Sequence, residues 1–491
     1  LNNFQPSETI SLSALLDKKD NITSVPPHVL VYEVYHLLKK IDSKKTSPDI
    51  PTRLYKEAAH LLAEPFTALF NQSLKNGIIP TKWKRTAVLP IPKCSRPSLN
   101  DLRQISLLPI PFKILEKLVL RNIQNKLLTG YGPNQYGFRP QSSTVCANIA
   151  LHDYIAKTLE DHDVQGIQVI AYDFAKAFDR LKFEVIIKNL LECEVPAAFI
   201  RWINNYLTER QQYVRIGMTE SNTLPISSGV PQGSVLGPYL FSSITGSFDV
   251  NDIPCKVIMY ADDFTICVPI YVKNRNTHVL AAHNAVCKWS ETVGLPLNTN
   301  KCRMMCISRK NNFVPVELDS VPLVNELKIL GVIFDTKGDW NTHVNSVIRC
   351  ASQRLFLIRL LKSQVNQEEI CIAFNSLVRS ILEYCAPLFI GLSKCRAQKL
   401  EKVVFRFHRL ICGDDYKTCK VHNFENLHER RKRAAMKLFN KSLSKTHVLH
   451  HISPVISPSG RILLPLTKTN FRLNSFFEQT SRIFNHNFVR K

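Results

Sequence analysis

The acidic pair Asp262 and Asp263 is the feature of this sequence best suited to chemistry. The pair interrupts a β-branched and aromatic run over 256–268, so two short apolar strands flank an acidic turn and a β-hairpin is expected. Adjacent carboxylates repel each other at such a turn unless a divalent cation neutralises them. Aspartate is also common in solvated turns, and the pair alone leaves both interpretations open.

A second segment favours the metal interpretation. Residues 166–174 (GIQVIAYDF) form a near-continuous apolar run, typical of a central strand buried on both faces, and Asp173 stands at its end. If this strand lies beside the hairpin, Asp173 faces Asp262 and Asp263 across the sheet. Three carboxylates could then hold two Mg²⁺ ions, as in enzymes of in-line phosphoryl transfer.

The order and spacing of three motifs resemble those of reverse transcriptases. D-F-A-K-A-F-D stands at 173–179, G-V-P-Q-G-S-V-L-G-P at 229–238 and Y-A-D-D at 260–263. With shorter segments between 74 and 140, they are most similar to the enzymes of LINE-type (non-LTR) retrotransposons. The resemblance implies an α+β fold, a right-hand polymerase with helical and strand fingers, an antiparallel-sheet palm and a helical thumb.

The same resemblance implies an activity and its partners. The expected enzyme is an RNA-directed DNA polymerase that uses an RNA template, a DNA primer or target and dNTPs, with two Mg²⁺ ions, or Mn²⁺, as cofactor. Its expected biological role is retrotransposition by target-primed reverse transcription. A catalytically silent RNA-binding protein of transposon origin and a metal-dependent nuclease are the alternative function classes.

By resemblance, Lys93 and Arg103 are assigned to the incoming nucleotide. Lys93 follows an expected strand over Val88–Ile91, and Arg103 comes ten residues later. An ammonium and a guanidinium would neutralise a triphosphate and orient its leaving group, whereas a solvated basic loop is the alternative. The family usually has proline after this arginine, but this chain has Gln104, which restores a backbone donor and loosens the turn.

Four further residues are assigned by resemblance. Phe178 would lie beneath the sugar and exclude a 2′-hydroxyl, although it could also be a core aromatic. Gln232 would touch the nucleotide or the template, and Gly233 would allow close approach, in a turn that leads into a helix starting at Ser234. Lys301 matches the lysine that protonates departing pyrophosphate, and an exposed strand lysine is the alternative.

Nucleic-acid contacts are expected mainly toward the C-terminus. Residues 327–334 look like the hairpin that grips the primer end, and Arg139 lies in what is either a template-contacting element or a packed turn. A basic stripe then recurs at three- or four-residue steps. It could follow the backbone of a template–primer duplex, or it could be a solvated face: Arg396, Lys399, Lys402, Arg406 and Arg409.

The overall charge favours a polyanionic partner. Lys and Arg number 64 against 40 Asp and Glu, an excess of 24 positive charges. No apolar run is long enough to span a bilayer, so a membrane partner is not expected. The basic run over 429–433 fits either nuclear entry or RNA contact, and we expect the protein in the nucleus and cytoplasm.

The 14 cysteines contain no C-x-x-C pair and are scattered through apolar segments, which predicts reduced thiols rather than a disulfide framework or a zinc ribbon. Cys412, Cys419, His422 and His428 invite a zinc interpretation. Their spacing matches no common zinc knuckle, so we expect no zinc there.

The chain divides into five expected parts. It begins with Leu1 rather than Met, which suggests a fragment of a longer polyprotein, so that an endonuclease would lie upstream or come from elsewhere. The oligomeric state is not predicted. The parts are an N-terminal helical extension (1–46), fingers (47–160), palm (161–340), thumb (341–440) and a tail that docks on the thumb or contacts RNA (441–491).

Overall fold

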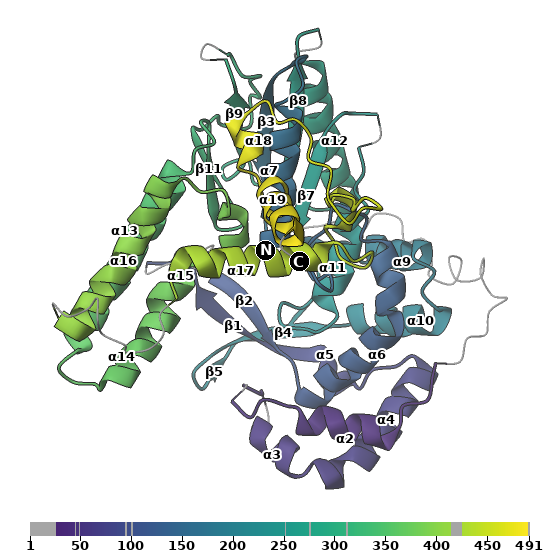
Figure 1. Ribbon diagram of the computed structural model, residues 1–491. Coiled ribbons are helices and arrows are strands. Elements are labelled where there is room, and N and C mark those ends of the chain that lie inside the picture. Colours follow the sequence, from purple (N-terminus) through teal and green to yellow (C-terminus); the bar gives the residue numbers. More distant parts are fainter. Residues whose placement is uncertain are drawn as a thin grey trace. The chain divides into compact units, whose positions relative to one another are not determined.

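The computed structural model describes residues 26–44, 46–48, 50–93, 96–99, 102–250, 252–273, 276–310, 313–413 and 425–489. The chain forms two compact units and passes between them more than once (Figure 1). The first unit comprises Leu1–Gly132, Phe174–Phe248 and Trp289–Pro296. The second unit comprises Pro133–Asp173, Asp249–Lys288 and Leu297–Lys491.

A five-stranded sheet organises the first unit. β1 (Arg85–Pro92) pairs antiparallel with β2 (Leu102–Leu107) and parallel with β4 (Gln211–Ile216). β4 also pairs with the two-residue strands β5 (Thr219–Glu220) and β6 (Leu224–Pro225). β1 contains the strand expected over Val88–Ile91. Lys93 follows its C-terminal end.

Helices make up the rest of the first unit. The longest, α6, buries an apolar stripe that includes Phe112 and Leu115. α4 ends at Gly77, whose left-handed conformation (φ 66°) is typical of a glycine C-cap. The helices are α2 (Val31–Lys39), α3 (Thr52–Glu57), α4 (Ala59–Asn76), α5 (Thr81–Lys84), α6 (Ile110–Thr129), α8 (Ala177–Arg180), α9 (Phe183–Glu192), α10 (Ala197–Leu207) and α11 (Gly237–Gly246).

The start of α11 differs from the prediction. The helix begins at Gly237 rather than at Ser234, and the Ser234 hydroxyl accepts a hydrogen bond from the Gly237 N–H at 2.8 Å. Pro238, in the first helical turn, supplies the start signal, because its fixed φ suits a helix and its missing N–H would have had no partner there. The serine prediction was therefore wrong by one turn.

An antiparallel sheet of order β7-β8-β3-β9 organises the second unit (Figure 1). Its strands are β3 (Val164–Tyr172), β7 (Lys256–Tyr260), β8 (Asp263–Tyr271) and β9 (Arg303–Ser308). β3 is buried along nearly all of its length because β8 and β9 pair with it on either side, which confirms the predicted central strand. α7 (Thr144–Thr158) packs against β7, β3 and β8.

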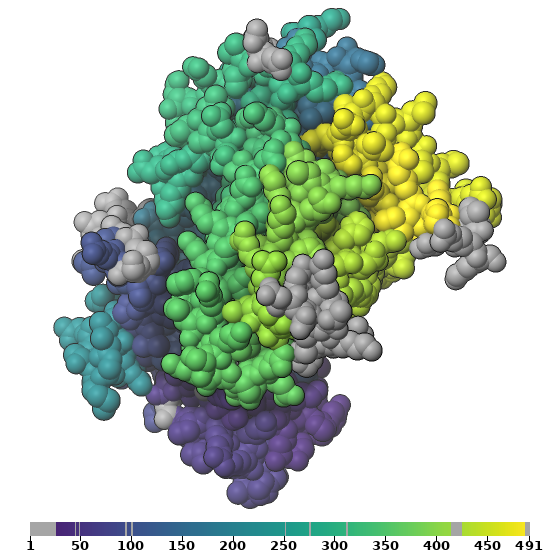
Figure 2. Space-filling model, turned by 60° about the vertical axis from the view of Figure 1, so that its left-hand side comes forward, coloured from purple at the N-terminus to yellow at the C-terminus, as the bar shows by residue number. Residues whose placement is uncertain are grey.

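The C-terminal half of the second unit is mainly helical. After α12 (Thr277–Val293) and the hairpin β10 (Glu326–Ile329) and β11 (Val332–Asp335), the chain forms α13 (Asn341–Leu361), α14 (Gln367–Phe374), α15 (Ser380–Leu382), α16 (Lys394–Cys412) and α17 (Leu427–Ser442). Figure 2 shows one face of the segment 341–412, in green. Its core is centred on Phe374 and Phe407, whose rings stack with centroids 3.7 Å apart.

The helical segment from Phe374 to Cys385 is not one continuous α-helix. A π-helical turn occupies Asn375–Arg379 and shifts the face that points inward, so Leu377 is 40% exposed instead of buried. Cys385 has φ 56° and ends the helical segment.

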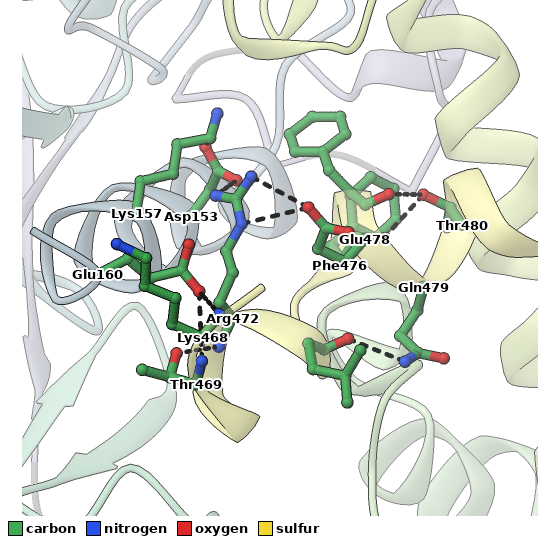
Figure 3. A network of polar contacts seen from close by, with 12 residues as sticks. Asp153, Lys157, Glu160, Lys468, Thr469, Arg472, Phe476, Glu478, Gln479 and Thr480 are labelled. Atoms are coloured by element: carbon green, nitrogen blue, oxygen red, sulfur yellow. Dashed lines mark hydrogen bonds and ion pairs between the residues drawn. The ribbon is translucent and has the colours of Figure 1, made fainter. Parts of the chain in front are cut away.

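The C-terminal tail contacts the expected thumb region and also a helix outside it. α18 (Asn470–Leu473) and α19 (Phe476–Val489) contact both α17 and α7. Figure 3 shows the polar part of this contact, in which Arg472 reaches Glu478 at 3.1 Å and Asp153 of α7 at 3.5 Å. Because all three side chains are almost fully buried, the tail belongs to the core of the second unit.

The α+β class is confirmed, with an antiparallel sheet where the palm is expected and helices where the thumb is expected. The five domain boundaries stay a prediction. Within the described residues, no helix combines the length and apolar character that crossing a membrane requires. Eleven described cysteines are free, whereas Cys412 is disulfide-bonded; Cys419 and His422 lie outside the described residues.

Candidate active site

The three predicted carboxylates come from neighbouring strand ends of the second unit. β3 and β8 pair with Tyr172 opposite Phe264, so Asp173, one residue beyond, stands opposite Asp263, the first residue of β8. β7 and β8 form the expected hairpin, in which Tyr260 pairs with Asp263 and the turn contains Asp262. The predicted placement of the strand beside the hairpin is therefore confirmed.

Electrostatic repulsion is evident at this end of the sheet. Partial burial, followed by the negative charges of Asp262 and Asp173, raises the pKa of Asp263 to about 6. Even so, within the described residues no three or more His, Cys, Asp or Glu side chains lie close enough together to hold a metal ion as they stand. The strand ends meet as predicted, and the charges of Asp262 and Asp173 reach Asp263.

Asp173 is also tied to the segment that leads into β9. Its Oδ2 lies 3.7 Å from Nζ of Lys301, its carbonyl accepts the Asn298 N–H at 2.7 Å, and its own N–H donates to Sγ of Cys302 at 3.5 Å. Both charged side chains are more than 40% exposed, so the ion pair adds little stability. Lys301 thus precedes β9 rather than lying within a strand, and its ammonium stands beside the acidic end.

In the first unit, Phe178 is held in place by the glycine motif. The Phe178 carbonyl accepts the Val230 N–H at 2.7 Å, and its ring stacks on Phe241 of α11 with centroids 4.5 Å apart. Gly229 has φ 84°, and a Cβ there would come within 2.6 Å of the Asp179 backbone. Only glycine permits this approach, so the two motifs at 173–179 and 229–238 pack directly on each other.

Gln232 and Gly233 lie against β2. The Gln232 carbonyl accepts the Ser106 N–H at 2.7 Å, and a Cβ on Gly233, whose φ is 119°, would come within 2.7 Å of the Ser106 carbonyl oxygen. The side chain of Gln232 donates to Oδ1 of Asp179 at 3.0 Å. The close approach predicted for Gly233 is therefore to a strand, and the Gln232 amide already has an acceptor within the protein.

Lys93 and Arg103 lie toward the end of the β1–β2 pair where the chain passes from one strand to the other. Arg103 stands opposite Ile91, Lys93 follows β1 directly, and both side chains are exposed. Burial raises the pKa of Asp179, while the Gln232 hydrogen bond and the positive charges of Lys176 and Lys93 lower it. Lys93 is thus near enough to that carboxylate to influence it.

Comparison with known proteins identifies the domain in which these residues lie. Residues 91–334 match the family described as "Reverse transcriptase (RNA-dependent DNA polymerase)". The "Probable RNA-directed DNA polymerase from transposon BS" of Drosophila melanogaster is 28% identical over 362 residues, which cover 68% of this chain and 38% of that protein. The chain carries a LINE-type reverse transcriptase domain.

Other relatives of this reverse transcriptase domain are more distant. The "RNA-directed DNA polymerase from mobile element jockey" of Drosophila melanogaster is 26% identical over 388 residues, which cover 74% of this chain and 41% of that protein. The chain therefore spans about two fifths of the length of these curated relatives. Among solved structures, apo telomerase from Candida Tropicalis has a TM-score of 0.42 and 12% identity, over 87% of this chain and 68% of that one.

Reverse transcriptases as a class depend on divalent metal ions. The residues of this domain fit that requirement by chemistry, since carboxylate oxygens are the ligands that hard cations prefer. Burial, together with the negative charges of Asp262 and Asp173, raises the pKa of Asp263. Asp173, Asp262 and Asp263 are the side chains of this edge that would hold such ions.

The basic stripe beyond the reverse transcriptase domain is only partly available to a ligand. Lys399, Lys402, Arg406 and Arg409 are exposed on α16, whose opposite face is buried. Arg396 instead donates hydrogen bonds to the side chains of Asp339 at 3.1 Å and Asn341 at 2.9 Å, and it therefore anchors the start of α13. Residue spacing within α16 does not reveal this pairing. Its signal in the sequence is the Asp-Trp-Asn segment, which stands where α13 begins.

The remaining predicted contacts have defined local structures. The hairpin at 327–334 is confirmed: Gly331 lies in its turn with φ 83°, and the adjacent Leu330 carbonyl accepts the Tyr384 hydroxyl at 2.7 Å. Arg139 is half-buried directly after Phe138, which has φ 53°. Their roles toward primer and template stay predictions.

Proposed function

We propose that this chain is an RNA-directed DNA polymerase that extends a DNA 3′-hydroxyl on an RNA template. The observation that carries the proposal is the pairing of β3 with β8 within the matched domain, which brings Asp173 opposite Asp263, the residue that follows Asp262. These three residues would hold two Mg²⁺ ions, or Mn²⁺. When bound, the ions activate the attacking hydroxyl and stabilise the leaving oxygen.

The chain's own residues supply the other parts of the reaction. Lys93 and Arg103, exposed toward one end of the β1–β2 pair, would neutralise the triphosphate of the incoming dNTP. Phe178, fixed by its stack on Phe241, would limit the space at the sugar 2′ position. Lys301, whose ammonium lies 3.7 Å from Asp173, would donate a proton to the departing pyrophosphate.

Charge supports the proposed partners, which are an RNA template, a DNA primer or target and dNTPs. The excess of 24 positive charges and the exposed cations of α16 favour binding to nucleic-acid backbones. The biological role that we propose is retrotransposition by target-primed reverse transcription. We place the protein in the nucleus and cytoplasm, which fractionation of cells that express the tagged chain would test.

Primer extension on poly(rA)/oligo(dT) with dTTP and either Mg²⁺ or Mn²⁺ tests the activity. The chain should extend the primer. Asp262→Asn should reduce extension to background and leave duplex binding intact, because only the metal-ligand charge is lost. Asp319→Asn, a change at an exposed aspartate outside the three motifs, is the matched control and should behave like the wild type.

Each other result has a defined meaning. RNA binding without extension in either metal would favour the catalytically silent RNA-binding protein. Cleavage of unprimed nucleic acid without dNTPs would favour the metal-dependent nuclease. Extension by Asp262→Asn at the wild-type rate would refute the metal assignment.

A further inference from the structure

The segment before Phe138 is built onto the strand that leads to the acidic turn. The Tyr136 N–H donates to the Met259 carbonyl at 2.8 Å, and the Met259 N–H donates to the Asn134 carbonyl at 2.9 Å. These bonds form a parallel bridge between Gln135 and Met259, one strand position before Tyr260. The segment over 134–137 therefore extends the sheet beside β7.

The side chain of Gln135 reaches from this segment to the turn itself. It is fully buried, and its Oε1 accepts hydrogen bonds from the Gly137 N–H at 2.7 Å and the Ala261 N–H at 3.3 Å. Ala261 is the first of two residues between Tyr260 and Asp263 and has φ 56°. Residues other than glycine rarely adopt this backbone conformation, so contacts with neighbouring residues must stabilise it at Ala261.

Gly137 explains how the segment comes so close. A Cβ at this position would lie 2.4 Å from the Ala261 nitrogen and 3.1 Å from the Tyr260 carbonyl carbon. Any side chain there would push the turn away and lengthen the bond from Ala261 to Gln135. The glycine and the glutamine thus act on the same peptide group.

We propose that Gln135 is a positioning residue that holds the turn bearing Asp262 and Asp263. By accepting the Ala261 N–H, it stabilises the left-handed conformation from which the two carboxylates project. Its effect on catalysis rests on the proposed polymerase function, but its effect on the turn does not. Gln135 itself touches neither substrate nor metal in this proposal.

Gln135→Met tests the role of the amide, because methionine has nearly the same length and no carbonyl acceptor. Hydrogen–deuterium exchange of the peptide that covers residues 258–264 should become at least about tenfold faster. Mn²⁺ binding, followed by its paramagnetic resonance signal, should weaken by a similar factor. The kcat of primer extension should fall by about tenfold with an unchanged KM for dTTP and an unchanged duplex Kd.

Two further variants separate positioning from general stability. Gln141→Met, at an exposed glutamine farther along the same connection, is the matched control and should leave exchange and Mn²⁺ binding unchanged. In Gln135→Met/Ala261→Gly, glycine adopts a positive φ without strain, so Mn²⁺ affinity should recover in part. If Gln135→Met does not fold, Gln135→Asn keeps an amide but withdraws its oxygen, and the same changes are expected.

The two proposals fail in distinguishable ways. An inactive wild type whose turn is protected, and loses protection in Gln135→Met, overturns only the polymerase function. An active wild type with unchanged exchange and Mn²⁺ affinity in folded Gln135→Met, or in Gln135→Asn, overturns the positioning role. Equal Mn²⁺ affinity of Gln135→Met with and without Ala261→Gly also contradicts it.

Discussion

The side-chain amide of Gln232 donates a 3.0 Å hydrogen bond to Oδ1 of Asp179. The same aspartate accepts the Ser228 hydroxyl through its backbone carbonyl at 3.0 Å, so one residue of the first motif holds both sides of the glycine turn. Burial raises the pKa of Asp179, and nearby cations with the Gln232 bond counter that effect. The carboxylate therefore organises the turn that we assign to the nucleotide.

Asp179→Ala should weaken nucleotide binding, because Gln232 loses its acceptor and the turn loosens. Loss of one hydrogen bond to a charged group, about 1.5 kcal/mol, corresponds to a rise of about tenfold in the KM for dTTP. Asp179→Asn keeps an oxygen acceptor and should show a smaller rise. Steady-state extension at varied dTTP measures both, and an unchanged KM in Asp179→Ala would contradict the role of this contact.

Phe178→Val should admit ribonucleotides, because the shorter side chain leaves room for a 2′-hydroxyl. The ratio of kcat/KM for dTTP to that for UTP should fall by at least about tenfold, equivalent to about 1.4 kcal/mol of lost discrimination. In the wild type the rings of Phe178 and Phe241 stack with an angle of 24° between their planes. Phe241→Leu removes this stack and should give a smaller loss of sugar discrimination. Equal sugar discrimination in wild type and Phe178→Val would refute the gate.

The stripe on α16 should divide into binding and anchoring residues. Lys402→Ala/Arg406→Ala removes two exposed cations, so the slope of log affinity against log salt should become shallower by about 1 to 2 units, as measured by fluorescence anisotropy with a primer–template duplex. Arg396→Ala should instead lower the melting temperature, since it breaks contacts to Asp339 and Asn341.

An exposed lysine elsewhere is the control for that experiment. Lys188→Ala on α9 should leave the salt slope unchanged. A salt slope that is the same in Lys402→Ala/Arg406→Ala and in wild type would show that the stripe is a solvated face.

Stability should fall in acid partly through His152. Burial and the charge of Arg472 lower the pKa of His152 to about 3, below its ordinary value of 6.5, so the folded protein keeps this ring neutral. Above pH 6.5 neither state binds the proton; below it only the unfolded chain does, and stability is lost until pH nears 3. At about 1.4 kcal/mol per pH unit below 6.5, His152 contributes about 2 kcal/mol to the loss of stability at pH 5.

His152→Phe isolates that contribution, because phenylalanine can keep the stack on Phe471, whose centroid lies 4.5 Å away, and does not titrate. Denaturant unfolding at pH 8 and pH 5 should show a smaller pH-dependent loss in the variant than in the wild type. Identical losses in the two proteins would contradict the burial of a neutral ring.

Local patterns predicted much of the fold. The apolar run over 166–174 predicted β3 as a central strand, and the broken run over 256–268 predicted the β7–β8 hairpin. Each prediction depends on hydrophobic periodicity or turn chemistry, which act over a few neighbouring residues. The same reasoning missed the π-helical turn at Asn375–Arg379, because no local residue type marks it.

The amino-acid sequence was enough to single out the candidate side chains, since the acidic pair, the aromatic and the basic residues stand in recognisable motifs. Folding set the hydrogen-bond partners, which are Asp179 for Gln232, Asp339 for Arg396 and, for a glutamine that no motif marked, the Ala261 amide for Gln135. A polar group that loses water on folding must find a partner, and that partner is whatever the packing brings near, however far along the chain it lies.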